Sequence, residues 1–241
     1  MSEARLKTTV LELLESAREV EMGVVNGLSE AERNAAGTED QWSAKDLVAH
    51  IATAKERLAR AMHAAAAGQT PSLEHDEHHV YAAHQRDTWA EARVAAERAY
   101  TSLVEQVATL DDAALTDVRH RAWTRGESLV AQVLTHGLWH PCGHLMEFAR
   151  ARGDASGIDR VRRVLVTATR RIENLPELRD DAITLYNMAC GEAQADQADR
   201  ALELLGDALR RDPELAENAK DDPDLAALRD TPAFRALVAG A

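Results

Sequence analysis

Residues 134–153 read LTHGLWHPCGHLMEFARARG, and the interpretation of the whole chain depends on this stretch. Three histidines, His136, His140 and His144, recur at every fourth residue. Residues four apart lie on one face of an α-helix, roughly 6 Å from one another. A glycine such as Gly153 commonly ends a helix. The stretch therefore predicts a helix that carries a row of histidines and ends at Gly153.

The rest of the chain has the same helical character. Its 241 residues allow one large domain or two small ones, and aromatic residues make up only 4% of it. A chain rich in alanine and poor in aromatic residues forms helices more readily than sheets. Helical periodicity is predicted over residues 3–27, 44–67, 77–110, 128–153, 158–174, 180–194 and 199–211, and in two short pieces within 221–238. The fold class is therefore predicted to be all-α.

His50 is predicted to face the core from a second helix, which Ser43 and Asp46 begin as a capping box. It shares a helix face with the apolar Leu47, Ala54 and Leu58. Two imidazoles four residues apart on one helix can bind one divalent ion, and a third ligand must then come from another helix. Three protein ligands leave an open position on the metal, as catalytic sites require. The alternative is a histidine-rich polar stripe on an ordinary amphipathic helix.

Two segments carry a family resemblance. QWSAKDLVAHIA (41–52) and WHPCGHLMEFARARG (139–153) resemble the two signatures of the DinB-like (YfiT-like) four-helix bundle superfamily, and the second is similar to its DfsB-type members. The resemblance implies an up-and-down four-helix bundle over residues 1–153. It also implies a divalent metal, zinc or nickel, bound by His50, His140 and His144.

His136 competes with His144 for the pairing with His140. The distance to Gly153 fits the HP-x-x-H form of the signature, so the resemblance favours His140 and His144 as the ligand pair, but the pair His136 and His140 stays open. In the favoured arrangement, His136 is a candidate partner that orients a ligand imidazole. Pro141 has no N–H, so the helix is expected to bend or open near Gly137.

The superfamily resemblance implies a metal-dependent transferase that joins a low-molecular-weight thiol to a small-molecule substrate, as in detoxification. The sequence alone leaves open whether this chain is an enzyme. The alternative function is a non-enzymatic binding or scaffold protein that uses its C-terminal segment.

That segment begins after GDASG (153–157), which is predicted to be a linker, so the domain boundary is placed between residues 153 and 154. LYNMACGEAQADQADRALELLGDALRRDP (185–213) resembles a tetratricopeptide repeat, with Asp196 in the region where that family has a glycine. One repeat cannot bury its own apolar stripe, so it is expected to pack against the helix at 158–174, against the first domain or against another protomer. A structural or homodimer-forming role is therefore favoured for residues 154–241, and contact with a protein partner is the alternative.

Charge and cysteine content restrict the partners and the compartment. The net charge is −13 and the pI is near 5.2, which argues against nucleic acids and anionic membranes as partners. Cys142 and Cys190 form no CxxC motif, and the N-terminus has no signal-peptide pattern, so a cytoplasmic location is expected. Cys142 lies about 200° around the helix from His140 and is predicted to be a buried residue outside the metal site.

Four further histidines precede or open the predicted helix 77–110, namely His75, His78, His79 and His84. They are interpreted as part of a polar loop and first helical turn. A second metal site, or a wall of the first site, is the alternative.

Overall fold

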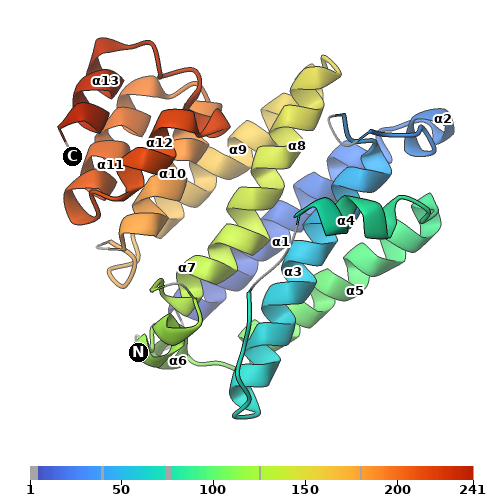
Figure 1. Cartoon of the computed structure of the whole chain (residues 1–241), viewed down its shortest axis with the longest axis horizontal. Coiled ribbons are helices and arrows are strands. Elements are labelled where there is room, and N and C mark those ends of the chain that lie inside the picture. Colours follow the sequence, from blue (N-terminus) through green and yellow to red (C-terminus); the bar gives the residue numbers. More distant parts are fainter. Residues whose placement is uncertain (1–4, 39–40, 74–76, 125, 180, 241) are drawn as a thin grey trace. The chain divides into compact units, whose positions relative to one another are not determined.

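The computed structural model of the chain describes residues 5–38, 41–73, 77–124, 126–179 and 181–240, with the side chains of 77–80 outside the description (Figure 1). Every regular element within these ranges is helical, which confirms the predicted all-α class. The chain divides into two compact units, Met1–Leu145 and Met146–Ala241. The predicted domain boundary at residue 154 stays a prediction.

The first unit contains α1 (Arg5–Asn26), α2 (Glu30–Arg33), α3 (Ala44–Ala66), α4 (Glu77–His84), α5 (Trp89–Ala108), α6 (Asp112–Leu115), η1 (Val118–Ala122), α7 (Leu129–Leu134), η2 (Thr135–Trp139) and the start of α8 (His140–Ala151). The segments α7, η2 and α8 follow one another without a break (Figure 1).

Four long helical segments of this unit enclose a common core. Helix α5 contacts α1 and α3, and η2 contacts the same two helices. The resulting ring buries apolar side chains from all four segments, including Leu13, Ile51, Leu103 and Leu138. The bundle expected for the first part of the chain is therefore compatible with the packing, and its up-and-down order stays a prediction.

Local capping sets the starts of the helices. Ser43 and Asp46 form the predicted capping box before α3, with the Asp46 carboxylate accepting hydrogen bonds from the backbone N–H and hydroxyl of Ser43 at 2.9 and 2.6 Å. The Ser128 hydroxyl accepts from the Ala131 N–H and begins α7, as predicted. These bonds satisfy N–H groups that the first helical turn leaves unpaired.

The single helix predicted over 77–110 is wrong. The chain leaves the helical conformation after His84, and α5 begins at Trp89. Thr88 and Glu91 form a second capping box, so α5 has its own start. The Asp87 carboxylate lies 2.6 Å from His84 Nδ1 across the break. The periodicity continues through the break, which is why the sequence pattern conceals it.

The opening predicted near Pro141 is confirmed as a turn of π-helix, η2. The His140 N–H donates to the carbonyl of Thr135, five residues earlier, instead of to the fourth residue back. Gly137 lies in this turn against α1, where an added Cβ would meet Leu14 Cδ2 at 2.1 Å. The wide turn and its glycine together let this segment lie close to α1.

A cluster of charged side chains is buried inside the bundle. Glu21 of α1 lies 2.7 Å from both Arg18 Nη1 and Lys55 Nζ, and the exposed fraction of Glu21 and of Lys55 is 1%. Arg18 also contacts the exposed carboxylate of Glu97 at 2.6 Å. The cations of Arg18 and Lys55 lie 5.6 and 6.0 Å from the ring centre of Tyr100. The carboxylate of Glu21 thus links α1 to α3 in the interior.

The second unit contains the remainder of α8, then α9 (Ala155–Ile172), α10 (Ala182–Gln194), α11 (Ala198–Arg211), α12 (Leu215–Asp221), η3 (Pro223–Leu225) and α13 (Pro232–Ala239). Helix α12 is absent from the sequence prediction. Pro223 and Pro232 stand in the first turns of η3 and α13, as predicted. The resemblance to a tetratricopeptide repeat stays a prediction.

The linker predicted at residues 153–157 is wrong in its second half. The Asp154 carboxylate accepts a hydrogen bond from Gly157 N–H and caps α9, so residues 155–157 form the first turn of that helix. Between α10 and α11, Asp196 takes a positive φ of 62°, which aspartate tolerates better than most residues. Asp196 therefore takes a left-handed turn position of the kind that glycine usually fills.

Candidate metal centre

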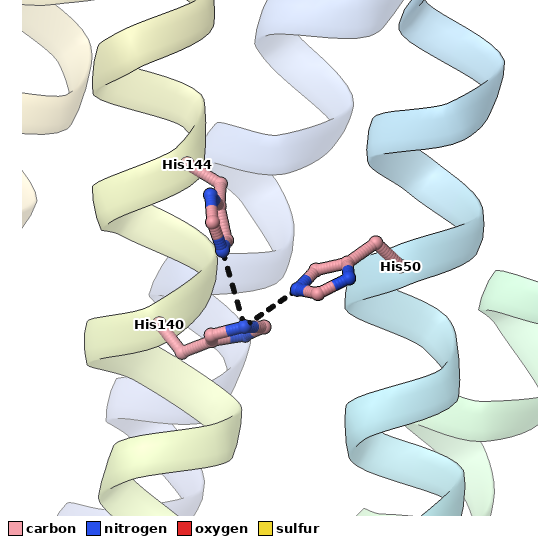
Figure 2. A group of neighbouring side chains, drawn as sticks. All are labelled: His50, His140 and His144. Carbon is pink, nitrogen blue, oxygen red and sulfur yellow. Dashed lines mark hydrogen bonds between the residues drawn. The ribbon is translucent and has the colours of Figure 1, made fainter. Parts of the chain in front are cut away.

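Three imidazoles from two helices converge in the first unit (Figure 2). His50 projects from α3, and His140 and His144 project from successive turns of α8. His140 Nε2 lies 2.9 Å from His50 Nε2 and 3.2 Å from His144 Nε2. The ligand atoms of all three residues lie within 4.8 Å of one another. The sequence thus identified a group that the fold brings together.

The register of α3 explains why His50 lies at this position. Leu47, Ala54 and Leu58 are buried with exposed fractions of 4% or less, and His50 lies on their side of the helix at the edge of the core. His140 and His144 are also partly buried. The three imidazoles are therefore partly shielded from water and lie at the edge of the core.

The spacing of the nitrogens fits a divalent ion. Tetrahedral zinc with metal–nitrogen bonds of about 2.0–2.1 Å holds its ligand nitrogens about 3.3 Å apart. The two Nε2 separations that involve His140, 2.9 and 3.2 Å, lie close to this value. The ligand atoms of the third pair, His50 and His144, lie within 4.8 Å of each other. The three residues present therefore fit the metal that the resemblance implies.

The charge state also suits a metal ligand. Burial, followed by the neighbouring His144 and His50, holds the pKa of His140 well below its ordinary value. His140 is therefore neutral near pH 7, which is the form that binds metals. Its other ring nitrogen, Nδ1, is buried and has no hydrogen-bond partner among the residues described.

His136 lies beside this group rather than within it. Its ring centre is 6.2 Å from that of His140, and the two ring planes meet at 69°. It does not belong to the set of ligand atoms within 4.8 Å. The arrangement agrees with the preference for His140 and His144 over His136 and His140, and the identity of the ligands stays a prediction.

His84 lies near this site. A small pocket beside His50 is lined also by Trp42, Tyr81 and His84. His84 is positioned by the Asp87 carboxylate at Nδ1 and by the Thr53 hydroxyl, 3.2 Å from Nε2.

Cys142 is fully buried, as predicted. Of the other histidines considered above, His75 and the side chains of His78 and His79 lie outside the description.

Trp42 directly precedes the cap Ser43, a position from which an apolar side chain can pack against the first turns of α3. In the structure its ring centre lies 4.5 Å from the ring of His50 and 5.4 Å from that of His144. The sequence signal was the position of Trp42 directly before the cap Ser43, but the contact with His144 joins residues about a hundred positions apart. Periodicity along one helix carries no information on such a contact.

A bundle of helices with convergent imidazoles on two of them defines this molecule as a helical protein with a candidate metal centre. A family model described as the DinB superfamily matches residues 13–148, more than half of the chain, and the chain belongs to that superfamily. Comparisons with curated proteins and with solved structures give no match. Among the described residues, no helix has both the length and the apolar character needed to cross a membrane.

Proposed function

We propose that this chain binds one divalent metal ion through His50, His140 and His144 and uses it to transfer a small thiol to an electrophilic substrate. The convergence of three Nε2 atoms from α3 and α8 is the observation that supports the proposal most directly. Membership of the DinB superfamily supports it independently. Zinc and nickel are the metals that the imidazole ligands and the superfamily favour.

The ligand set supports this chemistry through its charge. Three neutral imidazoles leave the full double positive charge of the ion uncompensated. When bound, the ion supplies Lewis acidity that lowers the pKa of a thiol. In the transfer, the thiol proton passes to solvent, sulfur forms a bond to an electrophilic carbon, and the leaving group departs with its bonding electron pair. The partly buried position of the histidines restricts water around the reacting sulfur.

Metal content tests the binding step. Protein purified without a histidine tag is expected to hold about one equivalent of metal per chain by elemental analysis, as a single three-histidine site requires. His50→Ala, His140→Ala and His144→Ala should each remove most of it. His63→Ala is the matched control, because His63 is exposed near the end of the same helix as His50. Wild-type protein that cannot be loaded with zinc, nickel or cobalt would refute the metal site.

Turnover tests the transfer step. Metal-loaded protein is mixed with glutathione or cysteine and with 1-chloro-2,4-dinitrobenzene, and the coloured thioether is followed by absorbance. The proposal expects a rate that requires the thiol, the metal and His140. Stoichiometric metal binding without turnover on either thiol would disprove transfer to this electrophile and would favour the non-enzymatic alternative.

A further inference from the structure

The indole of Trp42 lies against two of the three imidazoles at once. The plane of the indole is tilted by 45° from the ring of His50 and by 42° from the ring of His144, and the ring centres are 4.5 and 5.4 Å apart. His50 and His144 belong to different helices, and their own rings are nearly perpendicular, with centres 4.8 Å apart. The indole ring therefore contacts two candidate ligand rings whose planes are 85° apart.

The backbone that carries Trp42 is firmly held. The next residue, Ser43, is the N-cap of α3 and is bonded twice to the Asp46 carboxylate. The preceding loop packs tightly on this cap, because a Cβ added to Gly37 would lie 2.0 Å from Asp46 Oδ2 and 2.5 Å from Ser43 N. Tyr81 of α4 donates a hydrogen bond to the Gly37 carbonyl at 3.0 Å. The backbone next to Trp42 is thus held by the Ser43–Asp46 hydrogen bonds and by the packing of the Gly37 loop against them.

A metal site needs its imidazoles held in the correct plane, and the groups that orient them affect affinity strongly. An imidazole rotates about its χ2 bond through a broad, shallow energy well, so contact with a flat neighbour can select one orientation. We propose that Trp42 is a positioning residue of the metal centre, which holds the ring planes of His50 and His144 ready for the ion. This inference rests on the metal site proposed above.

Cobalt(II) binding tests the role of Trp42 without any assay of turnover, because the visible spectrum of the bound ion reports its coordination geometry. Trp42→Ala is expected to weaken Co²⁺ binding by about 10–100-fold, the usual effect of losing a group that orients a ligand, and to change the visible bands. Trp42→Phe keeps a flat ring and should recover most of the affinity and the wild-type spectrum.

Trp123→Ala is the matched control. Trp123 also contacts a histidine, His120, at a centre distance of 5.7 Å, but this pair is separate from the three candidate ligands. Its replacement should leave the dissociation constant for Co²⁺ and the spectrum unchanged. If circular dichroism shows that Trp42→Ala is unfolded, Trp42→Leu replaces it, because leucine fills space without a flat face. Trp42→Leu is expected to weaken Co²⁺ binding in the same way.

The outcomes separate the two proposals. Wild-type protein that takes up no Co²⁺ would refute the metal site and this inference with it. Wild-type protein that binds Co²⁺, together with a folded Trp42→Ala or Trp42→Leu variant that has the same affinity and spectrum, would overturn the positioning role alone. Weaker binding with an altered spectrum, recovered by phenylalanine, would support it.

Discussion

Gly137 is the residue at which the wide turn η2 meets α1. The space for its side chain is already filled by Leu14, whose exposed fraction is 1%. Gly137→Ala should lower the free energy of unfolding by about 1–3 kcal/mol, because an extra methyl in a full core forces its neighbours to move. Chemical denaturation followed by circular dichroism measures the change.

Gly27→Ala is the control for that substitution, since a Cβ at Gly27 meets only two backbone oxygens at 3.6 and 3.7 Å. It should leave the unfolding free energy nearly unchanged. The double variant Gly137→Ala, Leu14→Ala should lose less than the sum of its two single changes, because the smaller Leu14 replacement makes room for the methyl. Additive losses would show that the two residues do not compete for this space.

The thiols of Cys142 and Cys190 are expected to be unreactive in the folded protein. Burial raises the pKa of Cys142 to about 12, and burial together with Asp222 and Asp224 raises the pKa of Cys190 well above its usual range. The thiolate is the reactive form, and both groups stay protonated as the pH rises from 7 to 9. Ellman's reagent at pH 8 should therefore detect two thiols only after denaturation. A thiol that reacts rapidly in native protein would contradict this prediction.

At the scale of the helices, the buried ion pairs of Glu21 with Arg18 and Lys55 are expected to contribute strongly to stability. Glu21→Gln removes the negative charge that Lys55 and Arg18 share in this cluster. Two buried cations then lose their shared partner, and breaking such a pair costs about 3–5 kcal/mol of stability. Urea denaturation checks this value.

The exposed pair Arg98 and Glu56, 3.5 Å apart, provides the contrast. Arg98→Ala should change the unfolding free energy by less than about 1 kcal/mol, because water screens surface ion pairs. Equal losses for Glu21→Gln and Arg98→Ala would mean that burial does not strengthen the interior cluster.

The success of the sequence prediction differed from helix to helix for physical reasons. Caps such as Ser43 and Ser128 act over three residues, so the sequence reveals them directly. The sequence pattern hides the break after His84 because periodicity continues across it, although Thr88 and Glu91 have the spacing of a capping box. The helix face of His50 follows from its apolar neighbours Leu47, Ala54 and Leu58, which are local in the sequence. The partners of Lys55 and Trp42 depend on contacts between distant helices, which no local pattern encodes.

For the whole molecule, the proposed metal links folding to binding. An ion that binds only the folded chain stabilises it by about 2.7 kcal/mol at a hundred times its Kd. For a chain of this length, that corresponds to a rise in Tm of about 5–10 °C. Addition of Zn²⁺ to metal-free protein should produce this rise in a thermal melt, and a chelator should reverse it. His140→Ala should show no rise, whereas His63→Ala should behave like wild type; a rise that survives His140→Ala would place the stabilising ion elsewhere.

The wide turn η2 has a consequence for how this chain can vary. A π-turn holds about one residue more than a turn of α-helix, so it takes up one extra residue while the segments before and after it keep their mutual direction. Deleting one residue within 135–139 would let the turn close to a regular α-helix and should leave His140 and His144 directed toward His50. Inserting one residue there would instead rotate both histidines by about 100°. The stretch Thr135–Trp139 can therefore lose a residue more easily than it can gain one.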